Sequence, residues 1–243
     1  MTTLFISDLH LTEDDTKKLA LLQHFIEVQA CRADALYILG DFFEYWLGDD
    51  IDTELTAAVI EIFKPLKAFK TKIYIMRGNR DFLLGRSFAE QLGAEVISDP
   101  TIINLYGRAT LLTHGDRLCV DDQSFQFFLK VVNYPLIQKI FKALPPAWRK
   151  KIALYLRMKS KNSTMKKSVA IMDVVPREVQ RMFNLYRVSQ MIHGHTHKPG
   201  IHLFKNKDFS LCQRITLSDW EGSGHVLVCR PNHTLKLLSF NVT

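Results

Sequence analysis

Residues 35–50 read ALYILGDFFEYWLGDD, and the start of this stretch decides the fold. The apolar run from Ala35 to Leu39 has the length of a buried strand, and Gly40 ends it immediately before Asp41. A carboxylate therefore follows a strand at a point where glycine lets the backbone turn sharply. In an open α/β sheet, the carboxyl ends of the strands line the place where ligands bind.

Two further apolar runs repeat this order, and segments of helical period separate the three. The runs are residues 2–7 and 72–76, and the intervening segments 16–31 and 53–69 carry apolar residues at helical spacing. Strands that alternate with helices favour a largely parallel sheet joined by right-handed crossovers. We therefore expect an α/β fold in this part of the chain.

The pattern changes in the second half of the sequence. Residues 122–172 are compatible with helices broken at prolines, and another helix is expected from Pro176 to about Tyr186. Short strand-like runs lie at 95–97, 101–105, 109–113, 188–192, 214–217, 225–229 and 234–239. We expect one core, residues 1–121 and 173–243, that is interrupted by a helical insertion at 122–172.

Composition limits the class of protein. The 243 residues are 47% hydrophobic, which is enough for a sizeable core, and no stretch approaches the roughly 18 apolar residues of a membrane-spanning helix. The chain runs from Met1 directly into a β-like segment, so we expect no export signal and a cytoplasmic location. The four cysteines have no CxxC spacing, which favours buried thiols in a reducing compartment.

Positive charge is concentrated in one segment. The net charge is +7, yet residues 123–172 contain eleven Lys or Arg and no Asp or Glu, so the remainder of the chain is acidic on balance. Such a segment favours an anionic partner, although a solvated helical face has the same composition.

Polar residues of metal-binding type stand at five strand ends. They are Asp8 with His10, Asp41, Asn79, His114, and His195 with His197. Four imidazoles, two carboxylates and one amide suit Mn²⁺, Fe²⁺ or Zn²⁺, and this set is too large for one ion. We therefore expect two ions, about 3.5 to 4 Å apart, with Asp41 as the bridging carboxylate.

Each of these residues has a simpler interpretation when it is taken alone. An Asp and a His beside a strand are commonly part of a turn, and a single His is commonly a core residue with satisfied hydrogen bonds. An Asn before an Arg is commonly an Asx-turn residue. The occurrence of all five groups at strand ends favours the metal site.

These five blocks resemble those of the calcineurin-like metallophosphoesterase superfamily and follow the same order along the chain. The resemblance implies an αββα sandwich of two sheets, with the helical insertion as a lid. It also implies two metal sites that share Asp41. One would be completed by Asp8, His10 and His197, and the other by Asn79, His114 and His195.

The residues around the blocks are similar to those of the UDP-2,3-diacylglucosamine pyrophosphohydrolases of lipid A biosynthesis. The similarity covers residues 35–50, 78–83, 114–122, 168–174 and 192–197. It implies hydrolysis of UDP-2,3-diacylglucosamine to 2,3-diacylglucosamine 1-phosphate and UMP, with two divalent ions, expected to be Mn²⁺. The implied substrate contacts are Asn79, Arg80, Asp122, Ser160, Thr164, Lys167 and His195, and the implied catalytic residues are Asp41, Arg80 and His114. Thr164 stands where an asparagine is expected.

Arg80 stands where many metallophosphoesterases carry a histidine that protonates an alkoxide leaving group. An arginine remains charged near neutral pH and cannot serve as that acid. It can bind phosphate oxygens through two donors and stabilise developing charge. A sugar phosphate leaves without protonation, so Arg80 favours cleavage of a pyrophosphate by activated water attacking the UMP-side phosphorus.

The predicted insertion combines apolar and basic residues. Its apolar runs would suit acyl chains, because each CH₂ withdrawn from water contributes roughly 0.8 kcal/mol. Its basic residues are expected to attract anionic headgroups, which would place the protein peripherally on the cytoplasmic face of the inner membrane. These basic residues are Arg149, Lys150, Lys151, Arg157, Lys159 and Lys161. A packed helical cap remains the alternative.

Two other functions compete with this interpretation. Another metallophosphoesterase, such as a nuclease or a nucleotide phosphodiesterase, could use the basic segment to bind a polynucleotide. A nucleic-acid-binding module would have structural histidines, but the sequence shows no RNP-type or helix-turn-helix signature. We expect a lipid-linked nucleotide substrate and no nucleic acid, and the sequence gives no basis for inferring a protein partner.

Overall fold

The computed structural model describes residues 1–165, 167, 171–205 and 211–242, without the side chain of Thr164. Within these residues the chain forms two sheets, whose strands follow the orders β11-β10-β1-β2-β3-β4 and β5-β6-β7-β9-β8. The first sheet contains β1 (Thr3–Ile6), β2 (Ala35–Leu39), β3 (Lys72–Met76), β4 (Ala94–Ile97), β10 (Gly224–Cys229) and β11 (Leu235–Phe240). The second contains β5 (Thr101–Leu105), β6 (Arg108–Thr113), β7 (Gln190–His193), β8 (Gly200–Lys205) and β9 (Leu211–Thr216).

Both sheets are mixed, so the expectation of a largely parallel sheet is only partly correct. Strands β1 to β4 pair in parallel, as their alternation with helices predicts. Strands β10 and β11 then add to the edge of the first sheet as an antiparallel pair. In the second sheet β6, β7 and β9 are parallel, whereas β5 and β8 are antiparallel edge strands. Antiparallel partners need only short connections, which is why these runs lie close together in sequence.

Helices α1 (Thr16–Val28) and α2 (Glu54–Phe69) connect the first three strands, close to the predicted bounds. The Asp15 side chain caps α1 by accepting from Lys18 N, and Thr53 and Thr56 form a capping box at the start of α2. A short 3-10 helix, η1 (Ala30–Arg32), follows α1. The sequence pattern missed α3 (Arg86–Leu92), because seven residues are too few for a helical period to stand out.

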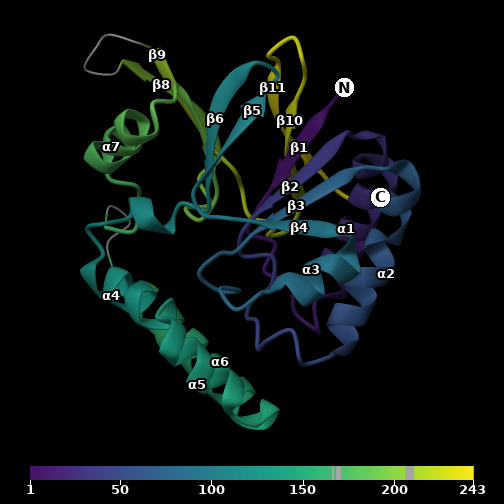
Figure 1. The fold of residues 1–243 in the computed structure, drawn as a ribbon, viewed down its shortest axis with the longest axis vertical. Helices are drawn as coiled ribbons and strands as arrows, with labels where there is room; N and C mark the ends of the chain where they lie inside the picture. Colours follow the sequence, from purple (N-terminus) through teal and green to yellow (C-terminus); the bar gives the residue numbers. More distant parts are fainter. Residues whose placement is uncertain (166, 168–170, 206–210, 243) are drawn as a thin grey trace.

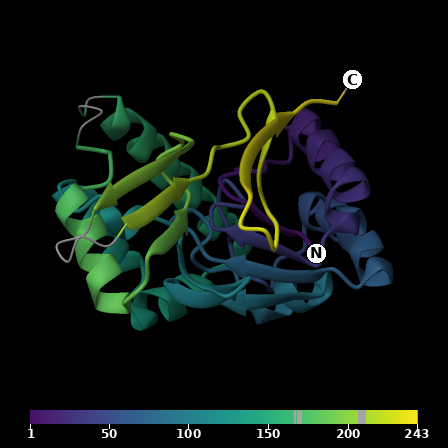
Figure 2. The same ribbon diagram turned by 90° about the horizontal axis from the view of Figure 1, so that it is seen from above.

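Three apolar clusters show that the layers stack as helix, sheet, sheet, helix. The first joins one face of the first sheet to α1, α2 and α3. The second fills the space between the two sheets, with Phe5 and Leu39 from one and Leu112 and Ile192 from the other. The third joins the second sheet to α7 (Pro176–Tyr186). Figure 2 shows the two sheets side by side with helices on their outer faces, which confirms the expected αββα sandwich.

The predicted insertion contains α4 (Gln123–Val132), α5 (Pro135–Ala143) and α6 (Pro146–Thr164). Figure 1 shows these helices projecting together beyond the sheets. Several of their large apolar side chains are exposed, among them Phe127 (70%), Ile140 (54%) and Trp148 (61%). Among the described residues, no helix is long and apolar enough to cross a membrane. The division into core and insertion, and the role of the segment as a lid, stay predictions.

One basic residue of this segment does not face outward as expected. Arg149 is only 4% exposed, because its guanidinium forms two bonds to Asp50 and donates to the Leu47 carbonyl oxygen. Its Nε donates to the Leu144 carbonyl oxygen. Arg149 therefore fastens the start of α6 to the 47–50 loop and cannot attract headgroups, so that expectation is wrong for this residue.

Candidate metal centre

All seven predicted ligand residues lie at the carboxyl ends of strands, in the order that the sequence predicts. Asp8 and His10 follow β1, Asp41 follows β2, and Asn79 follows β3, whereas His114 follows β6, and His195 and His197 follow β7. Each sheet therefore contributes to the same place. The backbone is left-handed, with φ between 51° and 69°, at Asp8, His10, Asp41, His195 and His197. Such a conformation is rare for residues other than glycine and clusters at functional sites.

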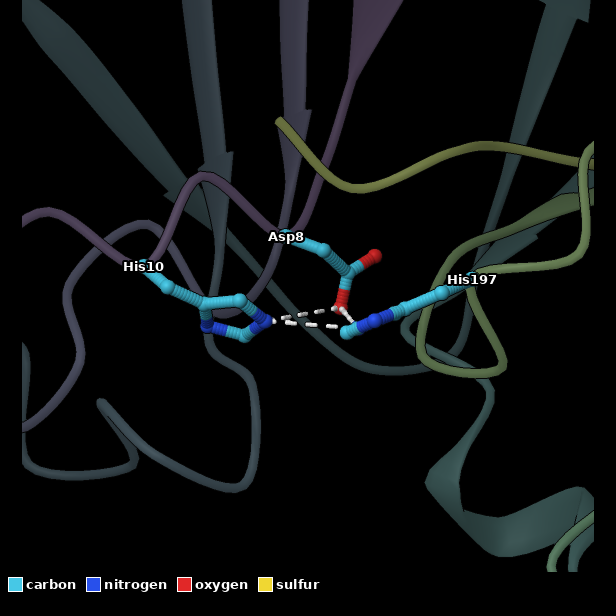
Figure 3. Close-up of side chains that lie close together, drawn as sticks. All are labelled: Asp8, His10 and His197. Carbon is cyan, nitrogen blue, oxygen red and sulfur yellow. Dashed lines mark hydrogen bonds and ion pairs between the residues drawn. The ribbon is translucent and has the colours of Figure 1, made fainter. Parts of the chain in front are cut away.

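Asp8, His10 and His197 form the first group of side chains. Their ligand atoms lie within 4.8 Å of one another. In Figure 3 the two imidazole rings approach the Asp8 carboxylate from opposite sides. The Nε2 atoms of His10 and His197 are 3.3 Å apart, and His197 Nε2 lies 3.3 Å from Asp8 Oδ1. Three donor atoms that converge in this way are an arrangement typical of a metal site.

Asp41, His114 and His195 form the second group, whose ligand atoms also lie within 4.8 Å of one another. The His114 Nε2 atom is 3.6 Å from Asp41 Oδ1 and 3.0 Å from Asn79 Oδ1. The other ring nitrogen of His114 is 2.9 Å from the Leu39 carbonyl oxygen, which fixes the ring orientation. Asn79 therefore lies where the sequence predicts, next to the second group.

Asp41 lies between the two groups. Its Oδ1 faces His114, and its Oδ2 is 4.0 Å from His10 Nδ1 in the first group. Within the described residues, Asp8 Oδ1 and His10 Nδ1 are buried without a hydrogen-bond partner. Buried polar atoms are nearly always paired, and Asp8 Oδ1 faces the Nε2 atoms of His10 and His197, so it fits a cation among these three atoms. His10 Nδ1 lies on the other side of its ring, 3.8 Å from Glu44 Oε2. The nitrogen and oxygen donors fit Mn²⁺, Fe²⁺ or Zn²⁺.

Burial and mutual charge shift the pKa values of these groups in opposite directions. Burial would raise the pKa of Asp8, but contact with His197 and the charge of His114 lower it well below its ordinary value. Burial raises the pKa of Asp41 to about 6 against the attraction of His114. Burial would lower the pKa of His114, but Asp41 and Asp8 raise it to about 9. The two carboxylates thus favour a protonated His114 until a cation displaces the proton, whereas burial lowers the pKa of His10 and His195.

Two glycines make the close packing of the ligands possible. A Cβ atom at Gly78 would lie 2.1 Å from Asp41 Oδ1, and one at Gly194 would lie 2.3 Å from Asp8 Oδ2. The buried Asp81 carboxylate joins the loops after β2 and β3, because it accepts from Phe42 N and Gly78 N at 2.7 Å each. These contacts fix the loops after β2 and β3 relative to each other.

The sequence interpretation missed three residues that contact this site. Asp219, which follows β9, lies with Oδ2 3.0 Å from His197 Nδ1. This contact raises the pKa of His197, against burial, to about 10 and orients its Nε2 atom toward Asp8. The others are Glu44, which accepts from Arg80, and Arg157, which donates to Glu44. The placement of Asp219 at a strand end was a usable signal, whereas its pairing with His197 depends on the fold.

The predicted substrate residues are only partly brought together. Asp122 caps α4, and both of its carboxylate oxygens accept from Lys167 Nζ, at 2.7 and 2.6 Å. One turn into α4, Phe125 stacks on His195 with 5.4 Å between ring centroids. Ser160 is exposed in α6, and no hydrogen bond in the described part of the chain joins it to this pair. Thr164 ends α6, and its side chain lies outside the described residues.

The profile of the family described as calcineurin-like phosphoesterase matches residues 1–199, which include every predicted metal ligand. The chain belongs to this family.

Curated relatives narrow the comparison. The chain is 43% identical, over 95% of its length and 95% of the relative's, to a UDP-2,3-diacylglucosamine hydrolase of Aeromonas hydrophila subsp. hydrophila. It is 42% identical to that of Serratia proteamaculans, over 93% of this chain and 94% of the other. It is 44% identical to that of Yersinia pestis bv. Antiqua, again over 93% and 94%. The similarity therefore covers nearly the whole chain, including residues 122–172.

Proposed function

We propose that the protein hydrolyses the pyrophosphate bond of UDP-2,3-diacylglucosamine to give 2,3-diacylglucosamine 1-phosphate and UMP in lipid A biosynthesis. The observation that carries the proposal is the pair of ligand groups that meet at Asp41 with Arg80 beside them. The names of relatives that are 42 to 44% identical over nearly the whole chain supply the substrate.

The ligand groups supply the place for two divalent cations, which we propose to be Mn²⁺. Asp8, His10, Asp41 and His197 would hold one, and Asp41, Asn79, His114 and His195 the other. Bound there, the cations would activate water for attack on the UMP-side phosphorus and neutralise phosphate charge. Asp41 is the only proposed ligand common to both sets.

Arg80 gives the site its preference for a pyrophosphate. Its Nε lies 3.3 Å from Asp41 Oδ2, so the charged guanidinium is held beside the proposed bridging carboxylate. It would neutralise the oxygens of the phosphate under attack. It cannot supply a proton to the leaving group, and a sugar phosphate does not require one. A site that must release an alkoxide would need an acid at this place.

The 122–172 segment supports the lipid part of the proposal. Exposed apolar side chains such as Phe127, Leu136 and Ile137 lie on α4 and α5, and α4 begins next to the site, where Phe125 stacks on His195. We propose that these helices act as a lid over the acyl chains. The Asp122 and Lys167 pair would then contact the polar part of the substrate.

The same segment would place the protein at its substrate. We propose a peripheral location on the cytoplasmic face of the inner membrane, supported by exposed apolar residues next to the basic residues Lys150, Lys151, Lys159 and Lys161. Each basic residue near an anionic surface contributes roughly 1 kcal/mol.

One assay distinguishes this proposal from its rivals. Purified protein with Mn²⁺ is given UDP-2,3-diacylglucosamine, a single-stranded RNA and a nitrophenyl phosphate in parallel. The proposal predicts turnover of the first at a kcat/KM at least about 10³ times that of the others, which lack the acyl chains or the pyrophosphate. Preference for RNA would identify a nuclease instead, and preference for the nitrophenyl ester a phosphomonoesterase.

A further inference from the structure

Glu44 connects two arginines that come from distant parts of the chain. It lies after β2, and its side chain is 23% exposed at the edge of the metal centre. One carboxylate oxygen, Oε2, accepts from Arg80 Nη1. The other, Oε1, accepts from Nε and Nη2 of Arg157 at 2.7 and 2.5 Å. The two oxygens are therefore divided between the two guanidinium groups, and Oε2 also lies 3.8 Å from His10 Nδ1.

Glu44 is the second carboxylate that holds the Arg80 guanidinium, in addition to Asp41. Arg80 Nε lies 3.3 Å from Asp41 Oδ2, while Nη1 is held by Glu44. The Arg80 backbone N–H also donates to Asp41 Oδ1 at 2.8 Å. A planar guanidinium that is held at two of its nitrogens by two carboxylates has a fixed plane as well as a fixed position.

The contact with Arg157 extends this support to the helical segment. Arg157 lies in the middle of α6, so its two bonds to Glu44 Oε1 join that helix to the edge of the metal centre. The start of α6 is fastened separately, through Arg149 and Asp50. Without Glu44, Arg157 would lose the acceptor of both of these bonds, and Arg80 would keep its contact with Asp41. The two positive guanidinium groups would then repel each other with no carboxylate between them.

We propose that Glu44 is a positioning residue that holds the Arg80 guanidinium beside Asp41 and couples it, through Arg157, to helix α6. This inference rests on the proposed role of Arg80 in hydrolysis. Glu44 itself need not contact the substrate. It sets the orientation of a charge that must face the reacting phosphate, and it makes that orientation depend on the placement of α6.

The test combines kinetics with amide hydrogen exchange. Glu44→Ala should lower kcat for UDP-2,3-diacylglucosamine by roughly tenfold or more, because misplacement of a preorganised group is costly. The manganese content should be unchanged. Without substrate, amide exchange in residues 154–160 of α6 should become at least about threefold faster, since local opening becomes easier. Arg157→Ala added to Glu44→Ala should then increase the exchange rate little further.

Glu13 provides the matched control. It also joins the core to α6, through a contact of 3.5 Å to Lys150, but this pair is exposed and lies outside the Arg80 network. Exposed ion pairs contribute little, so Glu13→Ala should leave kcat and exchange in α6 unchanged.

Glu44→Gln serves if the alanine variant does not fold, and it should shift both measurements in the same direction by a smaller factor. Unchanged kcat and unchanged exchange in either variant would overturn the inference. Loss of manganese would also overturn it, because Glu44 would then belong to the metal centre. If the wild-type protein does not hydrolyse UDP-2,3-diacylglucosamine, the proposed function fails, whereas the exchange measurement still reports whether Glu44 holds α6.

Discussion

The metal centre and the 122–172 segment differ in how their side chains are satisfied. At the metal centre, polar groups are buried and contact one another, and Asp8, Asp41 and His114 are almost fully enclosed. In the helical segment, apolar side chains such as Phe127 and Trp148 face outward, and no acidic residue occurs between residues 123 and 172. The metal centre thus buries charged groups away from solvent, whereas the helical segment exposes apolar side chains to it.

This difference supports the proposed roles, in which the metal centre carries out the chemistry and the 122–172 segment selects the substrate. Buried charges with shifted pKa values are typical of catalytic sites. Exposed apolar surface indicates binding to a lipid or a partner. Changes in the first region should therefore affect turnover of any substrate, whereas changes in the second should affect only acylated ones.

The largest effect is expected from Asp41→Ala. Because this carboxylate lies between both ligand groups, its loss should remove nearly all metal-dependent activity and at least one bound ion. Activity assays and manganese content by mass spectrometry measure both. Asp52→Ala, at an exposed position in the same loop, should change neither. More than a tenth of wild-type activity with two ions bound would contradict the bridging role.

Arg80→Ala should have the next largest effect. We expect kcat to fall by roughly 10² with metal content unchanged, which is the scale for losing one preorganised charge stabiliser. Arg80→His should not restore turnover, since an acid is not required and the two-point contact is lost. Recovery by histidine would mean that the leaving group needs a proton, and loss of metal would assign Arg80 to the metal centre.

Manganese affinity should depend steeply on pH. The pKa is raised to about 9 at His114 and to about 10 at His197, so both rings carry protons at neutral pH that a cation must displace. Affinity should therefore weaken as pH falls, by roughly tenfold per pH unit for each proton displaced. Calorimetric titration between pH 6.5 and 8.5, in buffers of different ionisation enthalpy, measures the dependence and the protons released.

Asp219→Asn tests whether His197 accounts for part of this pH dependence. It removes a contact that raises the pKa of His197, so the steep range should move to lower pH. A manganese affinity independent of pH would contradict the assignment of these histidines as ligands.

The smallest effect is expected in the helical segment and should be selective. Ile137 is 41% exposed in α5, so Ile137→Gln should cost little stability. It should raise KM several-fold for the diacylated substrate and leave a soluble pyrophosphate analogue unaffected. Ile102→Gln, at 47% exposure in β5, is the control and should affect neither substrate. Equal effects of Ile137→Gln on both substrates would contradict the proposed lid.

The convergence of the proposed ligand residues could be predicted because their signal is local: each follows a strand, and parallel strands end at one edge of a sheet. The strands could be predicted because a short apolar run is also a local property of the sequence. The partners Glu44 with Arg157, and Asp219 with His197, could not be predicted because they join segments that only the fold brings together. The inward turn of Arg149 depends likewise on the Asp50 carboxylate and the Leu47 carbonyl group, and no property of a basic segment indicates it.

The origin of the ligands in both sheets has a consequence for the stability of the sandwich. Asp8, His10, Asp41 and Asn79 extend from the first sheet, whereas His114, His195 and His197 extend from the second. Already, Asp8 Oδ2 accepts from His195 N at 2.9 Å across this boundary. Cations bound by ligands from both sheets would act as cross-links between them. A ligand that binds only the folded state stabilises it in proportion to the logarithm of its concentration. The melting temperature would then rise with the concentration of free metal ion, and a chelator would lower it by weakening the contact between the two sheets at the metal centre.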